Sequence, residues 1–180
     1  TPPPTPDKYT PRLSSAASDV YKRQEFSSLV GEHFPDRPFA DSQIIVSCAN
    51  PERTLLEKLF LLHEEFSKPE DKIMVDRLSR HLYDVEMLTR KGFLEIAIKE
   101  KELYNEIINH RQIYTKISEI DYNFHQPKAL NPLPPKATMN SWKKDYLKMQ
   151  EEMIHGDSLS FNELIERIAE IKNRINALEW

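Results

Sequence analysis

The sequence predicts a mainly α-helical protein, and three observations support this fold class. Only 3 of the 180 residues are glycine and 30% are charged, which is typical of long helices with solvated outer faces. Apolar residues recur at helical spacing in several segments. Residues 42–48 form the only convincing strand, because they contain a short β-branched run. We therefore expect a helical bundle attached to the last strand of another structure.

The first two helices are expected to form one hairpin with a loop near Pro69. The first begins at Pro51, where the missing N–H costs nothing, with Asn50 as its cap. The second covers about 71–90 and stops before Gly92. Their inward apolar residues are Leu55, Leu59, Leu62 and Phe66 in the first helix and Val75, Leu78, Leu82 and Val85 in the second.

The rest of the chain is expected to place helices on both sides of an irregular segment. A helix at about 103–114 precedes residues 119–136, where four prolines block continuous structure. A helix at about 142–153 follows. Ser160 and Glu163 then form a capping box, which predicts the start of a final amphipathic helix.

Residues 1–24 are expected to contribute nothing to fold or function. Five prolines fall within the first 11 residues, a composition that cannot build a core. Residues 19–24 reverse-translate as GAT GTG TAT AAG AGA CAG, which resembles the end sequence of a transposase-based sequencing adapter. We expect a read-through or assembly scar here, to be excluded from fold reasoning, with a natural Pro/Ser linker as the alternative.

The composition indicates the cellular compartment of the protein and limits the kinds of partner that it could bind. The single cysteine, Cys48, excludes an intrachain disulfide and a cysteine-based zinc site, so a reducing cytoplasm is the expected compartment. No apolar run approaches the roughly 20 residues needed to span a bilayer, so we expect no membrane partner. Net charge is −4, but residues 110–148 hold seven Lys or Arg against three acids. A polyanion is expected to meet this middle segment.

Lys58 is the first candidate site residue. It lies about 60° from the centre of the apolar stripe of its helix, so its stem should skirt the core while its ammonium reaches the rim. That placement suits a lysine that contacts phosphate as a point charge. The alternative is an ordinary surface lysine paired with Glu57 or Glu65.

Arg80, His81 and Asp84 share adjacent parts of one helix face, because their spacings are i, i+3 and i, i+4. Arg80 can pair with Asp84, which would lower the pKa of that carboxyl and hold it at a fixed angle. As a bare pattern, such pairs are common surface features that contribute little. A zinc site from His63, His81 and Asp84 can be imagined, but helical spacing alone does not support it.

Four motifs together resemble the AbiEii/AbiGii nucleotidyltransferase toxin family. Residues 54–59 (T-L-L-E-K-L) are similar to its E-K-L helix, and residues 77–88 (R-L-S-R-H-L-Y-D-V-E-M-L) to its R-H-x-x-D helix. Residues 142–149 (W-K-K-D-Y-L-K-M) resemble its W-x-x-D-Y-x-x-M helix, and 110–111 its H-R pair. The first two motifs occur in family order and at family-like separation, and the resemblance covers about 40–175.

The resemblance implies a fold, a reaction and a set of roles. It implies a cytoplasmic toxin of a toxin–antitoxin or phage-defence system, with a polymerase-β-like core that uses Mg²⁺ and NTP. Some members modify the acceptor end of tRNA, which implies NTP, an RNA such as tRNA and a cognate antitoxin as partners. Lys58 would contact phosphate and Asp84 would be the catalytic carboxylate of this half. Glu57, Arg80 and His81 would support the site.

The sequence departs from the family at the metal motif. The family carries a Gly-Ser turn followed by D-x-D on a strand, and two-metal transfer needs those carboxylates. This sequence contains no Gly-Ser pair. Its nearest acidic triplets are Glu119-Ile120-Asp121 and Asp84-Val85-Glu86. In a helix, positions i and i+2 diverge by about 200°, so Asp84 and Glu86 cannot chelate one metal. No metal ligand is therefore assigned.

These observations lead to a division of the chain and two hypotheses. Residues 25–49 are expected to be a remnant of a truncated α/β nucleotidyltransferase core, and 50–180 a C-terminal helical domain. The first hypothesis is a fragment of a toxin that, at full length, transfers nucleotides from NTP to RNA, and that is inactive as it stands. The second is a non-catalytic helical module that binds an antitoxin or RNA. An unrelated helical bundle with chance motifs is the third interpretation.

Overall fold

The computed structural model describes residues 21–37, 44–115, 117 and 120–180, and it divides the chain into two compact units, Thr1–Asn50 and Pro51–Trp180. Most of residues 1–24 lie outside the described residues, but residues 21–24 form part of a strand that pairs with residues 46–49, so these four residues do contribute to the fold. None of the described helices is long and apolar enough to cross a membrane.

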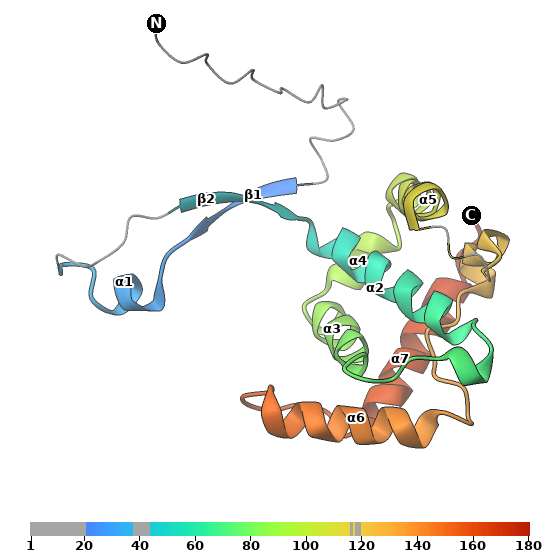
Figure 1. Cartoon of the computed structure of the whole chain (residues 1–180). Coiled ribbons are helices and arrows are strands. Elements are labelled where there is room, and N and C mark those ends of the chain that lie inside the picture. The colour runs from blue at the N-terminus through green and yellow to red at the C-terminus, as the bar shows by residue number, and fades with distance from the viewer. Residues whose placement is uncertain (1–20, 38–43, 116, 118–119) are drawn as a thin grey trace, which may run out of the picture. The chain divides into compact units, whose positions relative to one another are not determined.

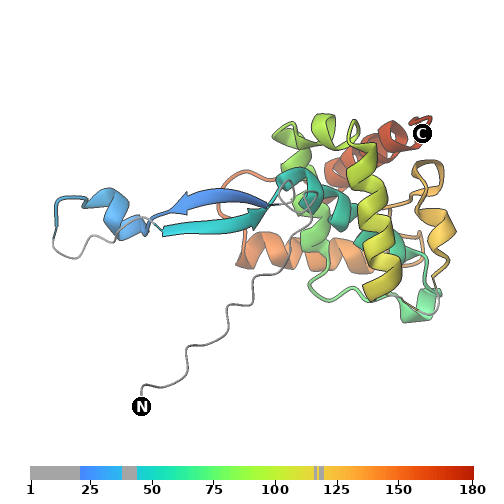
Figure 2. The ribbon, with the colours of Figure 1, turned by 90° about the horizontal axis from the view of Figure 1, so that it is seen from above.

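The described part of the first unit is a two-stranded antiparallel ribbon with one short helix. Strand β1 covers Tyr21–Phe26, helix α1 Leu29–His33, and strand β2 Ile44–Ala49. The two strands lie side by side along their whole length, as Figure 2 shows. The β-branched run thus forms a strand as predicted. The expectation of a single strand was wrong, because β1, with the polar sequence Y-K-R-Q-E-F, carries no apolar alternation to reveal it.

The second unit is a bundle of helices (Figure 1). Its longer elements are α2 (Pro51–Phe66), α3 (Ser79–Arg90), α4 (Phe93–Ala97), α5 (Lys101–His110), α6 (Met139–Glu152) and α7 (Phe161–Asn176). A π-helical turn, Arg111–Thr115, continues α5, and the proline-containing segment that follows holds only short 3₁₀ turns. The prediction of a mainly helical protein is confirmed for the described residues.

Helix α3 lies at the centre of this bundle, with contacts to α2, α4, α6 and α7. The predicted stripe of α2 is buried, since Leu55, Leu59 and Leu62 are fully enclosed. Trp142 and Tyr146 bring α6 into the same core. Burial of such large side chains stabilises a helix more than its intrinsic propensity does. The position of α3 is therefore fixed by packing from several sides.

Helix α3 begins at Ser79, not near Asp71 as the sequence predicted. Residues Glu70–Lys72 form a separate 3₁₀ turn. The physical reason is Arg77, whose φ of 59° lies in the left-handed region. A right-handed helix cannot pass through that backbone conformation. The predicted end is confirmed: α3 stops at Arg90, and Gly92 follows with a φ of 85°.

Helix α7 starts as its sequence predicted. The Ser160 hydroxyl accepts a hydrogen bond from the Glu163 N–H, and the Glu163 carboxylate accepts one from the Ser160 N–H. This reciprocal pair satisfies two donors that a helix start leaves unpaired. Glu163 is exposed, and hydrogen bonding to its carboxylate by the side chain and the backbone N–H of Ser160 lowers the pKa of this carboxyl.

Candidate functional site

Lys58 of α2 and Asp84 of α3 meet between the two helices. The Lys58 Nζ lies 2.9 Å from Asp84 Oδ2, and the two side chains are 26% and 39% exposed. The sequence predicted this approach from the hairpin arrangement of the two helices. An ion pair this exposed contributes only about 0–1 kcal/mol to stability. The pair is thus inexpensive to open when a ligand competes for either partner.

His81 completes the cluster. Its Nδ1 lies 2.9 Å from Lys58 Nζ but 3.9 Å from Asp84 Oδ2, which is too long for a hydrogen bond. The ammonium of Lys58 has no acceptor capacity, so it donates to both the carboxylate and the imidazole. His81 accepts at Nδ1 in this arrangement, which requires the neutral tautomer with its proton on Nε2. The result is one cation shared by an anion and a neutral ring.

Opposing effects set the charge state of Asp84. Burial raises the pKa of its carboxyl, but the adjacent His81 and the hydrogen bond and positive charge of Lys58 together outweigh burial and lower it below the ordinary range. Asp84 is therefore an ionised carboxylate at neutral pH. It can accept hydrogen bonds from a ligand but cannot act as an acid there.

This cluster opens into a surface hollow. Its lining residues are Thr54, Lys58, Asp84, Met87, Leu88 and Lys91. Lys91 is exposed and adds a second ammonium to the same hollow. Two lysines and one carboxylate at the rim of an apolar floor could hold an anion such as a phosphate. The four polar positions come from α2, from α3 and from the residue after α3.

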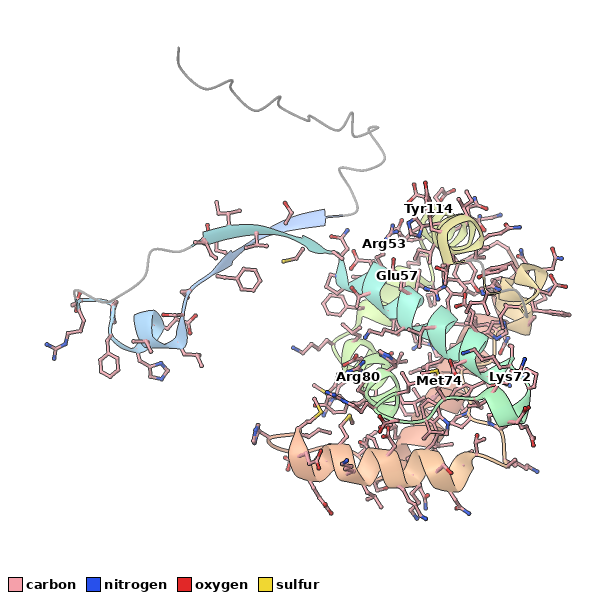
Figure 3. All side chains as sticks on the ribbon, viewed as in Figure 1. Arg53, Glu57, Lys72, Met74, Arg80 and Tyr114 are labelled. Atoms are coloured by element: carbon pink, nitrogen blue, oxygen red, sulfur yellow. The ribbon has the colours of Figure 1, made fainter. Side chains whose placement is uncertain are left out.

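Two of the five predicted site residues lie apart from this cluster. Glu57 points to the α5 side of α2, where its Oε1 accepts a hydrogen bond of 2.9 Å from Arg53 Nε (Figure 3). Successive helix positions are 100° apart, so Glu57 and Lys58 face different neighbours. The alternative of a Lys58 paired with Glu57 or Glu65 was wrong. Glu65 instead accepts from Lys68 and from the Met74 N–H.

Arg80 does not pair with Asp84, which corrects the pairing expected from their i, i+4 spacing. Within the described residues Asp84 is paired with Lys58, while Arg80 is exposed on the α6 side of α3 (Figure 3). There Arg80 lines a second hollow with Tyr83, Asp84 and residues near the end of α6. Because α2 packs closely against α3, Lys58 of α2 lies near enough to pair with the Asp84 carboxylate in place of Arg80.

A second polar cluster, which sequence reasoning did not find, lies buried on the other side of α2. Glu64 is 2% exposed in its side chain and accepts hydrogen bonds from Arg111 and from His125 Nε2, the latter at 2.9 Å. The Nε of Arg111 lies 2.7 Å from Glu64 Oε1, and its Nη2 donates to Oε2, so the ion pair is bidentate. Burial raises the pKa of Glu64, but Arg111 and His125 together lower it below its usual value. Arg111 belongs to the H-R pair of the sequence, which was the available signal.

His63 joins this buried region and not the Lys58 site. Its Nδ1 accepts a hydrogen bond of 3.0 Å from the Asn131 N–H, and its ring meets that of His125 edge to face. The imagined zinc site of His63, His81 and Asp84 is therefore not assembled. No group of three His, Cys, Asp or Glu side chains among the described residues could hold a metal ion.

The buried cluster predicts acid-labile folding. Burial, followed by the charge of His125, lowers the pKa of His63 from 6.5 to about 4. The unfolded chain then binds a proton that the folded chain excludes, so stability is lost as pH falls from about 6.5 to about 4. The pKa of Glu64 is also lowered, which extends the loss below pH 4.5. We expect on the order of 3 kcal/mol less unfolding free energy at pH 4 than at pH 7.

Urea unfolding at pH 7.5, 6, 5 and 4 checks this expectation. His63→Asn places an acceptor near the position of Nδ1 without a titrating group, so its unfolding free energy should change less than that of the parent between pH 7.5 and 5. Equal pH dependence in the parent and in His63→Asn would contradict the role of His63.

The described residues do not fit the Mg²⁺ site that the resemblance implies. Asp84 is engaged by Lys58 and His81, and Glu86, 4% exposed, is paired with Arg90. These two carboxylates thus face different partners, as their helical spacing requires. Glu119 of the other acidic triplet lies outside the described residues. Asp84 and Glu86 therefore do not form the pair of carboxylates that would hold one Mg²⁺ ion.

One comparison identifies the family. The sequence model described as "Nucleotidyl transferase AbiEii toxin, Type IV TA system" matches residues 15–167, which is most of the chain. No curated protein and no solved structure matches it. The matched range contains both helices that bring Lys58, His81 and Asp84 together. The chain belongs to the AbiEii family of nucleotidyl transferase toxins of type IV toxin–antitoxin systems.

Proposed function

We propose that this chain forms part of a toxin that transfers nucleotides from NTP to an RNA such as tRNA, with Lys58 and Asp84 at its nucleotide site. The observation that supports it most is the Lys58–Asp84 contact of 2.9 Å, which joins the two family helices at an open hollow. The family match gives the reaction class.

The chemistry of the three side chains fits a triphosphate ligand. When phosphate oxygens enter the hollow, the Lys58 ammonium exchanges its weak, partly exposed contact with Asp84 for a more highly charged acceptor. Asp84, ionised, then accepts hydrogen bonds from sugar hydroxyls or from a water held beside the nucleotide. His81 fixes the direction of the Lys58 amine through its Nδ1. Phosphoryl chemistry depends mainly on such positioning and charge stabilisation.

The carboxylates for Mg²⁺ are proposed to come from a Gly-Ser…D-x-D segment outside these 180 residues, in a nucleotidyltransferase core to which residues 25–49 belong. When bound there, the metal would stabilise the charge on the transferred phosphoryl group. Arg80 and Glu57 are proposed to support the site from its edges. Arg80 adds a cation beside Asp84, in the hollow that both residues line. The protein is proposed to act in the cytoplasm, where a cognate antitoxin neutralises it.

The basic middle segment supports RNA as the acceptor. Five of its seven cations are exposed lysines, which are Lys128, Lys136, Lys143, Lys144 and Lys148. Arg111, in contrast, is used in the buried pair with Glu64. Exposed lysines contribute salt-dependent contacts with a phosphate backbone but no sequence preference. This feature is also compatible with the second candidate, a helical module that binds RNA without chemistry.

A transfer assay with two proteins separates these candidates. Labelled NTPs, tRNA and Mg²⁺ are incubated with the 180-residue chain, and with the same chain joined to the proposed Gly-Ser…D-x-D segment, which is to be sought in the genomic sequence upstream. We expect label on the RNA only with the joined protein. Labelling by the 180-residue chain would contradict the need for outside carboxylates. RNA binding without labelling by the joined protein would favour the non-catalytic module.

A further inference from the structure

Helix α3 lacks a cap of its own at the end that carries the candidate site. The residue before it, Leu78, has an apolar side chain and makes no capping hydrogen bond. The Ser79 hydroxyl is buried without a hydrogen-bond partner among the described residues. A helix start leaves several backbone N–H groups that need acceptors. In α3, the His81 N–H donates locally to the Leu78 carbonyl oxygen, but the acceptor for the first N–H of the helix, that of Ser79, comes from another part of the chain.

Asp145 of α6 supplies this acceptor. Its Oδ1 accepts a hydrogen bond of 2.8 Å from the Arg77 N–H, and its Oδ2 accepts one of 3.0 Å from the Ser79 N–H. One carboxylate thus spans the left-handed residue and the first residue of α3. Its negative charge also lies at the positive end of the helix dipole, where it is favourable.

The position of Asp145 is itself rigid. Trp142 and Tyr146, which are three residues before and one residue after it, are fully buried. The Tyr146 hydroxyl also donates a hydrogen bond to the Leu159 carbonyl oxygen. Asp145 therefore holds the start of α3 at a fixed place relative to α6, which is packed into the core. Arg77, in its left-handed conformation, persists only where the surroundings hold it.

We propose that Asp145 is a positioning residue for the Lys58–Asp84 site. His81 and Asp84 lie in the first two turns of α3, directly after the backbone that Asp145 holds. If the first turn unwinds or slips by one residue, each side chain rotates by about 100° and leaves Lys58. This role would explain why the W-x-x-D-Y-x-x-M motif of α6, which contains Asp145, occurs together with the R-H-x-x-D motif of α3. This inference rests on the proposed function.

Hydrogen exchange on the 180-residue chain tests the cap directly. In Asp145→Ala, the amides of residues 77–84 should exchange about tenfold faster, the usual consequence of a lost cap, while those of α7 keep their protection. Asp121→Ala removes a similar side-chain cap from Asn123 and should leave residues 77–84 unchanged. If Asp145→Ala unfolds the whole unit, Asp145→Asn decides, because it keeps one oxygen acceptor. Unchanged exchange at residues 77–84 in the folded variant would overturn the proposal.

Transfer kinetics with the joined protein test the positioning role. Turnover by Asp145→Ala should fall by about tenfold or more, and Asp145→Asn should recover part of it. Lys58→Ala and Asp84→Ala, measured in parallel, separate two failures. Full transfer by these two variants overturns the proposed function. Loss of transfer in them, together with full transfer by a folded Asp145→Ala, overturns only the role of Asp145.

Discussion

Lys58→Ala and Asp84→Ala are each expected to abolish toxicity of the joined protein while leaving its fold intact. Both side chains are partly exposed at the rim of the α2–α3 contact, so each truncation should cost no more than about 1 kcal/mol of stability. Loss of a charge contact made in the transition state typically costs about 100- to 1,000-fold in rate. Growth inhibition on induction and thermal melts of each variant provide the two measurements.

Three controls define this result. Lys99→Ala removes an exposed lysine that lines none of the described hollows and should retain full toxicity. Leu59→Ala creates a cavity in the core and should lower stability by about 2–5 kcal/mol. The double variant Lys58→Asp/Asp84→Lys restores an ion pair, but the positive and the negative charge that would face a nucleotide have changed places. Recovery of toxicity in that double variant would show that only the pair matters.

The sequence predicted the helices well where packing and capping signals coincide. Pro51 at the start of α2, the capping box of α7 and Gly92 after α3 all mark boundaries that the structure confirms. The start of α3 was missed because its cap is 66 positions away in sequence. Periodicity within a segment cannot reveal an acceptor supplied by another helix. Strand β1 was missed because a polar segment becomes a strand only through its partner.

The site was also predicted only in part, because contacts between helices do not follow from the pattern within one segment. Helical spacing places Lys58 and Asp84 at the edges of the apolar stripes of two helices that form a hairpin. The two side chains do meet. Which partner a carboxylate takes depends on distances between helices, and here the cross-helix Lys58 replaced Arg80. The buried Glu64–Arg111 pair joins positions 47 residues apart. No local pattern distinguishes such a glutamate from its exposed neighbours.

Glu64→Ala is expected to destabilise the helical unit strongly. The substitution leaves Arg111, which is 14% exposed, and His125, which is fully buried, without their carboxylate acceptor. Removing one partner of a buried ion pair costs about 3–5 kcal/mol, because the other charge stays desolvated and unpaired. In a unit of this size, such a loss lowers the thermal midpoint by roughly 10–20 °C. Differential scanning calorimetry at pH 7.5 measures it.

The structure offers a matched control for this prediction. Glu95 also pairs with an arginine, Arg174, at 2.6 Å, but both side chains are about half exposed. Solvent screens that pair, so Glu95→Ala should change stability by no more than about 0.5 kcal/mol. Glu64→Gln should fall between the two, because the amide oxygen can still accept one hydrogen bond from Arg111 or His125. Because the two glutamates differ mainly in burial, equal midpoints for Glu64→Ala and Glu95→Ala would mean that the buried pair does not hold this unit together.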